Sequence, residues 1–263
     1  LYCEVDGRFP NHHPDPSVPE NLADLQAAVR EHQADIGLAF DGDADRLGVV
    51  TDAGEIIWPD RVLMPLAEEV LMQHPGAAIV YDVKCSWHLT RLIERLGGQP
   101  ILWKSGHSLI KAKMRETGAL LGGEMTGHFV HADDWFGFDD AFYAAARLLR
   151  LLARRGGSSA EFFAAWPAGL STPELRLDMA EGAPFAFMER LAAQADFGPE
   201  ARVITLDGLR VEFPQGWGLV RASNTTPSLV LRFEADDPAA LAEIQDRFRR
   251  PLLALQPDLA LPF

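Results

Sequence analysis

Short apolar runs alternate with segments of helical periodicity between residues 60 and 123, and this alternation restricts the fold more than any other feature. Each apolar run has the length of a buried strand, whereas the segments between them repeat their apolar residues at helical spacing. Such an alternation is typical of an α/β layer with a parallel or mixed sheet. The expected strands of this layer are residues 78–83, 100–103 and 119–123, and its expected helices are residues 60–73, 86–96 and 107–117. Before it we expect a helix at residues 21–32, capped by Asn21, and a strand-turn-strand with strands at residues 35–40 and 47–51.

The sequence pattern changes after Pro167, where helices give way mainly to strands. A helix expected over residues 139–155 ends in two arginines with Gly156 beyond them, as helices commonly end, and residues 160–166 are also helical. The part that follows has the profile of a small α+β domain, and we place the main boundary at residues 168–172. Its expected strands are residues 173–178, 202–206, 209–213, 218–222 and 229–235, and its expected helices are residues 185–194 and 238–255.

Composition excludes several classes of protein. The 263 residues include 24 Lys+Arg against 38 Asp+Glu, giving a net charge of -14, and 48% are hydrophobic. The chain is therefore too apolar to be disordered and too acidic to bind nucleic acid or membrane surfaces in general. Cys3 and Cys85 are too few for a disulfide framework. Without an apolar run of about 18 residues or a secretory signal, we expect a cytoplasmic protein with a small-molecule partner.

Three aspartates occupy alternate positions in a glycine-containing turn between two apolar runs. Asp41, Asp43 and Asp45 can therefore converge on one point. Two such charges 4 Å apart repel by roughly 4 kcal/mol at an effective dielectric of 20, so a bound divalent cation is the natural remedy. Ligands that are all oxygen favour Mg²⁺ or Ca²⁺. The alternative for such a turn is a solvated acidic loop.

Two known motifs compete for this turn. A calcium EF-hand needs glycine at its sixth loop position and glutamate at its twelfth, where this chain has Arg46 and Asp52, so an EF-hand is excluded. Phosphohydrolases of the haloacid-dehalogenase type also place Asp-x-Asp after an apolar strand, the first aspartate being the nucleophile. Asp45 at the next alternate position favours three metal ligands over a nucleophile and an acid.

A second polar turn lies at residues 123–128. Its two glycines let the backbone turn sharply while Glu124, Thr126 and His128 point into the same space. Glutamate and threonine suit the vicinal hydroxyls of a sugar, and histidine can carry a proton near neutral pH or donate to a phosphate. The alternative is a polar turn without function.

A third polar turn lies at residues 221–227, directly after an expected strand. It combines the guanidinium of Arg221 with three hydroxyls, one amide and free backbone N–H groups, which together suit phosphate oxygens. The alternative is a hydrogen-bonded Asx turn.

With these three motifs in this order, the sequence resembles the α-D-phosphohexomutases, most closely their bacterial phosphomannomutase/phosphoglucomutase branch. Shorter matching segments at residues 9–14, 82–85 and 104–108 extend the resemblance from end to end. The resemblance implies a mixed α/β-layer domain followed by a small α+β domain. The implied parts are residues 1–55, the end of domain 2 with the metal loop; residues 56–168, the sugar-binding domain 3; and residues 169–263, the phosphate-binding domain 4.

The resemblance also implies an activity, the reversible transfer of a phosphoryl group between O1 and O6 of a mannose or glucose phosphate through a bound hexose 1,6-bisphosphate. The donor in the family is a phosphoserine of the first domain, in a loop of the Thr-Ala-Ser-His-Asn-Pro type. No serine in this chain is followed by His-Asn-Pro. We therefore expect a C-terminal portion of a longer, monomeric enzyme, whose partner is its own serine domain and which is inactive alone.

Carried over by position, the family's roles fall on the three turns and on two residues between them. Thr126 stands where the branch usually has serine. Ala44 replaces a frequent glycine, which is tolerable only if its backbone keeps a negative φ. The implied sites are Asp41, Asp43 and Asp45 for Mg²⁺; Arg46, His128 and Lys84 at the reacting end; His107, Glu124 and Thr126 for the sugar; and Arg221, Ser223, Asn224 and Thr225 for the phosphate that does not react.

Three alternatives remain open at this point. One is a phosphoglucosamine mutase, against which Met125 argues because those enzymes typically carry glutamine there. Another is a naturally short module that binds a sugar phosphate or a metal without turnover. The third is a phosphatase with Asp41 as its nucleophile, which would be active alone and lost in Asp41→Asn.

Overall fold

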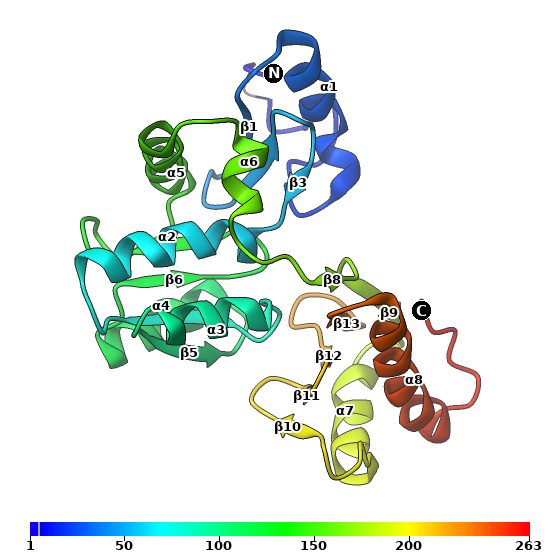
Figure 1. Cartoon of the computed structure of the whole chain (residues 1–263). Coiled ribbons are helices and arrows are strands. Elements are labelled where there is room, and N and C mark those ends of the chain that lie inside the picture. Colours follow the sequence, from blue (N-terminus) through cyan, green and yellow to red (C-terminus); the bar gives the residue numbers. More distant parts are fainter. Residues whose placement is uncertain (5) are drawn as a thin grey trace. The chain divides into compact units, whose positions relative to one another are not determined.

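The computed structural model describes residues 1–4 and 6–263, which form two compact units, residues 1–168 and residues 169–263 (Figure 1). Unit 1 holds two sheets, and unit 2 holds one. Among the described residues, no helix has both the length and the apolar character needed to cross a membrane.

The first sheet of unit 1 is a three-stranded antiparallel sheet in the order β1-β2-β3. Leu22, Val29 and Val50 join this sheet to its short helices in a small apolar cluster. The acidic turn connects β1 to β2. The elements are η1 (Pro19–Leu22), α1 (Ala23–His32), β1 (Ile36–Phe40), β2 (Leu47–Thr51) and β3 (Ile56–Ile57).

The second sheet of unit 1 is mixed, one of the two predicted arrangements, with the order β5-β4-β6-β7. Strand β4 pairs in parallel with β5 and β6, and β7 runs antiparallel to β6. The turn between β6 and β7, residues 123–128, carries the predicted sugar-binding residues Glu124 and Thr126, and we call it the sugar turn. The strands are β4 (Ala78–Asp82), β5 (Gln99–Trp103), β6 (Leu121–Gly123) and β7 (Phe129–His131).

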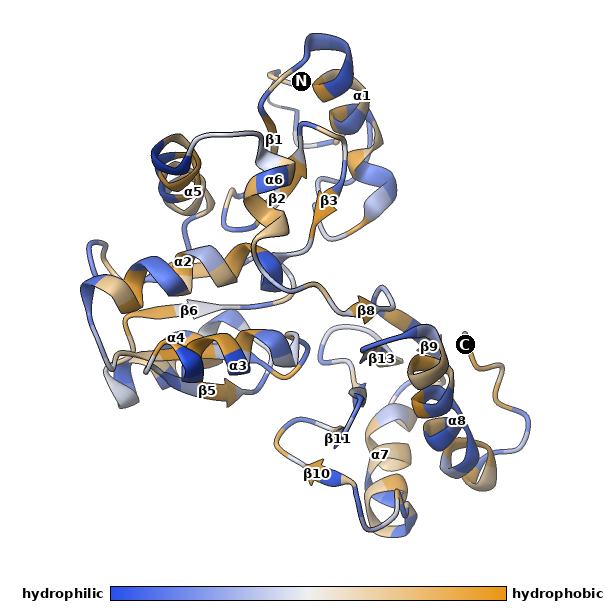
Figure 2. Ribbon diagram, in the orientation of Figure 1, coloured by the Kyte–Doolittle hydropathy of each residue, from blue (hydrophilic) through white to orange (hydrophobic). Residues whose placement is uncertain are grey.

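Helices cover both faces of this mixed sheet. Alternate residues of β4 point to opposite faces, so each set packs against different helices. Ile79 and Tyr81 pack in the main core with α2, α3 and α5, whereas Ala78 and Val80 pack with α4. Figure 2 shows hydrophobic and hydrophilic residues on each of α2, α3 and α4, as expected for helices that pack on one side. The helices of unit 1 are α2 (Pro59–Gln73), α3 (Trp87–Arg95), α4 (His107–Thr117), α5 (Ala141–Arg155) and α6 (Ser159–Ala164).

Side-chain caps fix where several of these helices begin. Ser86 caps α3, Asp140 caps α5, and Ser158 with Glu161 forms a capping box at α6. The prediction of Asn21 as a cap was wrong: Asn21 lies within η1, and its Nδ2 donates to the carbonyls of two residues in the preceding loop.

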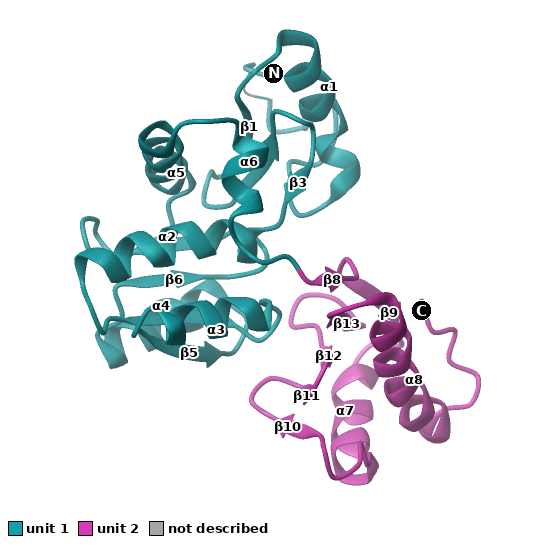
Figure 3. Ribbon diagram, viewed as in Figure 1, with its two compact units in different colours: residues 1–168 teal, residues 169–263 magenta. Residues whose placement is uncertain are grey.

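Unit 2 is one antiparallel sheet with two helices, which is the predicted α+β pattern (Figure 3). Its strand order is β10-β11-β12-β13-β8, and β9 also pairs with β13. Apolar residues of this sheet pack with both helices in one core. The elements are β8 (Leu170–Ser171), β9 (Leu175–Asp178), α7 (Ala183–Gln194), β10 (Arg202–Ile204), β11 (Leu209–Phe213), β12 (Gly216–Ala222), β13 (Ser228–Ala235) and α8 (Pro238–Leu255).

Three short strands were not predicted. These are β3, β7 and β8, each with only two or three residues, too few to show an alternating pattern. Each is fixed by pairing with a neighbouring strand rather than by its own sequence.

Candidate active site

The acidic turn brings its three aspartates together as predicted. One carboxylate oxygen each from Asp41, Asp43 and Asp45 lies within 4.8 Å of the others, a spacing that fits a single hard cation with oxygen ligands. We call these three residues the acidic triad. Asp41 Oδ1 accepts backbone N–H groups from Asp45 and Arg46, both at 3.0 Å, and these bonds close the turn.

Charge in the acidic turn is only partly balanced by Arg46. Arg46 Nε donates to Asp41 Oδ2 (2.7 Å), and its Nη1 donates to Asp15 Oδ1 (2.9 Å). Burial would raise the pKa of Asp41, but the hydrogen bonds and charge of Arg46 lower it below its usual value. Burial and the neighbouring carboxylates raise the pKa of Asp45. A bound cation would relieve this crowding of negative charge.

The backbone of Ala44 overturns the expectation of a negative φ at this position. Its φ is 59°, in the left-handed region that glycine favours. Two hydrogen bonds hold it there: Ala44 N donates to the Asp41 carbonyl (3.3 Å), and the Ala44 carbonyl accepts from Ala141 N (3.2 Å). The turn therefore contains backbone strain at the position that directly precedes Asp45.

We expect Ala44→Gly to raise the free energy of unfolding by about 0.5–1 kcal/mol, because glycine adopts positive φ without the steric cost of a Cβ. Urea unfolding followed by tryptophan fluorescence measures the change. The matched control is Ala27→Gly at an exposed position of α1, which should cost about 1 kcal/mol. Losses of equal size in the two variants would contradict the strain at Ala44.

Two backbone contacts join the acidic turn to the sugar turn. Arg46 and His128 form an isolated antiparallel bridge, and Leu47 N donates to the Gly127 carbonyl (3.0 Å). Gly127 has a φ of 105°, and a Cβ there would lie 3.0 Å from the Leu47 carbonyl oxygen, so only glycine fits. The first sheet and the mixed sheet thus bring their polar turns side by side.

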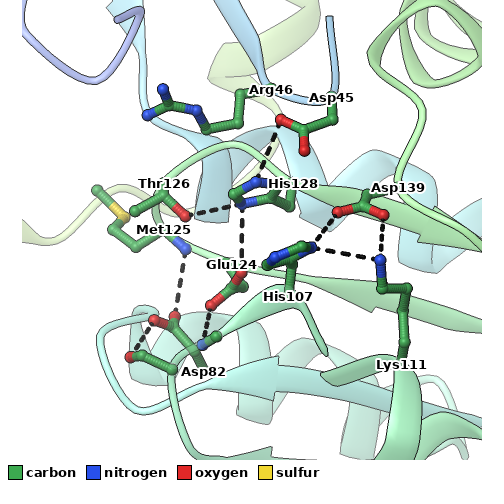
Figure 4. Close-up of polar contacts among 12 residues, drawn as sticks. Asp45, Arg46, Asp82, His107, Lys111, Glu124, Met125, Thr126, His128 and Asp139 are labelled. Atoms are coloured by element: carbon green, nitrogen blue, oxygen red, sulfur yellow. Dashed lines mark hydrogen bonds and ion pairs between the residues drawn. The ribbon is translucent and has the colours of Figure 1, made fainter. Parts of the chain in front are cut away.

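His128 lies between carboxylates of both turns (Figure 4). Its Nε2 is 3.3 Å from Asp45 Oδ1, and its Nδ1 is 3.2 Å from Glu124 Oε2. Burial alone would lower the pKa of His128, but the hydrogen bond and charge of Glu124, together with the charges of Asp45 and Asp139, raise it above its usual value. His128 therefore holds a proton more firmly than an exposed histidine does, next to the acidic triad.

The remaining sugar-turn residues are fixed from within unit 1. Glu124 is buried, and its Oε1 accepts from the backbone N–H of Gly106. Thr126 Oγ1 lies 3.2 Å from His128 Nδ1. Glu124, Thr126 and His128 therefore converge, as the sequence predicted.

His107 also lies at this site, at the start of α4. Its ring stacks on that of His128, with centroids 5.0 Å apart. Its Nδ1 lies 2.7 Å from Asp139 Oδ2, and Asp139 also accepts from Lys111. Burial would raise the pKa of Asp139, but its bonds to Lys111 and His107 lower it.

Lys84 lies beside a buried carboxylate below the sugar turn. Lys84 is 5% exposed, and its Nζ is 4.0 Å from Asp82 Oδ2. Asp82 accepts from Ser105 Oγ (2.7 Å), Cys85 Sγ (3.1 Å) and the backbone N of Met125 (3.2 Å). Complete burial raises the pKa of Asp82. Asp82, the last residue of β4, thus connects the loop after β4, the loop before α4 and the sugar turn.

The third polar turn, residues 221–227, which we call the phosphate turn, lies in unit 2 where β12 leads into β13. Ser223 Oγ accepts from the backbone N–H groups of Thr225 (3.3 Å) and Thr226 (3.2 Å), so a serine side chain, and not Asn224, closes this turn. Asn224 and Thr225 are exposed. Arg221 is buried; its Nε donates to Asp207 (3.1 Å), while its Nη2 has no hydrogen-bond partner among the described residues. That free donor fits an anionic ligand.

Sequence reasoning missed four polar residues of the site in unit 1. Asp139 is the first residue of an expected helix and Lys111 lies one turn after His107, so both positions carried a signal. Asp82 ends a strand beside the other motifs, which was also a signal. Asp15 lies in a proline-rich loop, and nothing in the sequence marks its contact with Arg46.

The fold and these turns define a family, and the chain belongs to it. Models of three domains of the phosphoglucomutase/phosphomannomutase family match in order: alpha/beta/alpha domain II at residues 1–54, alpha/beta/alpha domain III at residues 58–168 and the C-terminal domain at residues 174–250. The predicted membership of the α-D-phosphohexomutases and the predicted fold class are thereby confirmed.

Individual relatives are similar along the whole chain. The phosphomannomutase/phosphoglucomutase of Pseudomonas putida is 57% identical over all 263 residues, which cover 57% of that protein. The phosphoglucomutase of Neisseria gonorrhoeae is 55% identical, with the same coverage. The chain therefore spans a little over half the length of these relatives.

Solved structures agree with this similarity. A phosphoglucomutase/phosphomannomutase family protein from Burkholderia thailandensis has a TM-score of 0.93 and 55% identity, covering 100% of this chain and 56% of its own. The phosphoglucomutase parafusin of Paramecium has a TM-score of 0.75 at 16% identity, covering 100% of this chain and 54% of its own, which shows a shared fold.

Proposed function

We propose that this chain is the metal-, sugar- and phosphate-binding part of an enzyme that moves a phosphoryl group reversibly between O1 and O6 of mannose or glucose phosphate. The observation that carries the proposal is the joining of the acidic turn to the sugar turn through Arg46, Leu47, Gly127 and His128. A cation site thereby adjoins a carboxylate, a hydroxyl and an imidazole suited to a sugar. The names of the relatives support hexose phosphates as the substrate class.

The hexose 1,6-bisphosphate intermediate and a phosphoserine donor belong to the same proposal. The donor lies outside these 263 residues, in a serine domain of the same protein, so we expect no turnover from this chain alone. The proposed parts are residues 1–55 for the metal loop, residues 56–168 for the sugar and residues 169–263 for the phosphate.

In this proposal the acidic triad of Asp41, Asp43 and Asp45 holds Mg²⁺, which offsets the charge of the transferring phosphoryl group when bound. Arg46 adds positive charge beside the triad. His128 accepts or returns the proton of the attacking hydroxyl, a role that its position between two carboxylates supports.

Each unit contributes its own binding residues in this proposal. Glu124 and Thr126 hydrogen-bond the sugar hydroxyls O3 and O4, while His107 and Lys84 contact the substrate near its reacting end. The phosphate turn, through Arg221, Ser223, Asn224 and Thr225, holds the phosphate that does not react, so that the sugar can bind in either orientation. Phosphoryl transfer depends mainly on such positioning and charge neutralisation.

Calorimetric titration with glucose 1-phosphate and mannose 1-phosphate in the presence of Mg²⁺ tests the proposal. We expect Arg221→Ala to weaken binding about 10- to 150-fold, because hydrogen bonds to a charged group contribute about 1.5–3 kcal/mol. Glu124→Ala should weaken it about tenfold through the sugar hydroxyls.

The matched control is Arg202→Ala, which removes an exposed arginine of the same unit that pairs only loosely with Glu212 (3.5 Å) and should leave binding unchanged. Equal binding by the unaltered chain and by both site variants would contradict the assignment of these turns to the sugar phosphate.

A further inference from the structure

A second group of potential metal ligands overlaps the acidic triad at one residue. His107, His128 and Asp139 join Asp45 there, and one ligand atom from each lies within 4.8 Å of the others. We call these four residues the His–Asp tetrad. Figure 4 shows Asp45 beside His128 and Asp139 beside His107, with the two imidazole rings next to one another. Four separate segments of unit 1, namely the acidic turn, the start of α4, the turn between β6 and β7 and the segment before α5, therefore direct nitrogen and oxygen donors at one small volume.

Two of the distances within the tetrad are close to those of a four-coordinate ion, and all of them lie within 4.8 Å. Zinc bonds to nitrogen and carboxylate oxygen of about 2.0–2.1 Å place neighbouring ligand atoms about 3.4 Å apart in a tetrahedron. His128 Nε2 and Asp45 Oδ1 are 3.3 Å apart, and His107 Nδ1 and Asp139 Oδ2 are 2.7 Å apart. The first pair already has the spacing of bound ligands, and the second needs to open by less than an ångström.

Hydrogen bonds behind the tetrad orient its ligands as they do in zinc proteins. His128 directs Nε2 at the tetrad, while its Nδ1 lies 3.2 Å from the buried carboxylate of Glu124. Carboxylates in this position behind a metal-binding imidazole fix its tautomer and its ring orientation. Asp139 directs Oδ2 at His107 within the tetrad, while its Oδ1 accepts from Lys111.

The donor set selects a different ion from the one that suits the acidic triad. Two imidazole nitrogens and two carboxylate oxygens suit Zn²⁺ or Co²⁺, whereas an all-oxygen triad suits Mg²⁺. The two carboxylates of the tetrad balance the charge of a divalent ion. The Nζ of Lys111, 3.3 Å from His107 Nδ1, is the cation that such an ion must compete with.

We propose that Asp45, His107, His128 and Asp139 form a binding site for a four-coordinate transition-metal ion of the Zn²⁺ type. The ion shares only Asp45 with the acidic triad. Because the proposed function assigns His107 and His128 to the substrate, an ion in the tetrad also blocks substrate binding. That consequence rests on the proposed function, whereas ion binding itself does not.

Titration of the 263-residue chain with Co²⁺ tests the site by visible absorption. Four-coordinate Co²⁺ with imidazole ligands absorbs far more strongly than six-coordinate Co²⁺ among oxygens, so the signal reports the tetrad and not the triad. We expect a strong band that saturates at one ion per chain. His107→Ala, at a residue whose side chain is 46% exposed, should weaken Co²⁺ binding at least about tenfold.

Two matched variants separate the tetrad from its neighbours. Asp43→Asn alters the acidic triad alone and should leave the strong band in place. Lys111→Met removes the competing cation and should tighten Co²⁺ binding. A chain without the strong band would overturn the proposal, and so would a band that survives His107→Ala but disappears in Asp43→Asn. Circular dichroism of each variant confirms that it is folded.

Discussion

Replacing Arg147 by methionine is expected to lower the free energy of unfolding of unit 1 by about 3–5 kcal/mol, since the change leaves buried carboxylates without their cation. Arg147 is 2% exposed; its Nε donates to Glu69 Oε2 (2.8 Å) and its Nη1 to Asp133 Oδ2 (2.8 Å). Burial would raise the pKa of Asp133, but His131 beside it (3.5 Å) and the hydrogen bond and charge of Arg147 lower it well below its usual value. Asp133 must therefore stay ionised inside the protein.

Urea unfolding followed by tryptophan fluorescence measures this loss mainly in unit 1, because Trp217 is the single tryptophan of unit 2 in the sequence. Arg150→Met is the matched control. Arg150 contacts the same Glu69 (2.8 Å), but its side chain is 39% exposed, so its loss should cost less than about 1 kcal/mol. Comparable losses of unfolding free energy in Arg147→Met and Arg150→Met would contradict the prediction that burial of Arg147 causes the larger loss.

Asp82→Ala is expected to lower the free energy of unfolding by about 3 kcal/mol and to weaken glucose 1-phosphate binding at least about tenfold. The carboxylate accepts from Ser105, Cys85 and the backbone of Met125, and each buried donor left without it costs about 1–3 kcal/mol. Loss of the Met125 contact releases the turn that carries Glu124. Glucose 1-phosphate binding then falls, because the sugar-facing groups of this turn are no longer held in one geometry.

Asp82→Asn is the control for this prediction, because asparagine keeps one oxygen acceptor in the same place. It should recover part of the stability and part of the binding measured by calorimetry. Asp60→Ala removes another buried carboxylate, which accepts from the backbone of Ser86 (3.0 Å), and should lower stability without weakening binding. If Asp60→Ala weakened binding as much as Asp82→Ala, the effect would be one of global stability.

The alternation of apolar runs predicted most of the fold because the long strands and helices fill their cores from their own periodicity. Helix α4 ends at the predicted residue, and β4 to β6 pair in the predicted mixed sheet. Strands β3, β7 and β8 could not be predicted, because neighbouring strands rather than local sequence determine them. The N-cap at Asn21 failed for a similar reason, since its side chain bonds to the loop before it.

Within the site, residues grouped in one turn were predictable and residues that join separate turns were not. The convergence of Asp41, Asp43 and Asp45 follows from alternate positions in a single loop. The contact of Asp15 with Arg46 depends on how a long proline-rich loop folds back, which no local pattern encodes. The left-handed Ala44 was misjudged because hydrogen bonds across the turn, invisible in the sequence, hold it there.

The backbone bridge between Arg46 and His128 has a consequence for engineering. Chimeric proteins that exchange residues 123–128 between relatives would separate the sugar turn from the acidic turn with which it shares hydrogen bonds. The close approach of Gly127 to the Leu47 carbonyl and the hydrogen bond from Leu47 N to the Gly127 carbonyl couple the two turns, so they are transplanted successfully only as a pair. A change of sugar preference by loop exchange therefore has to carry residues 41–47 with it.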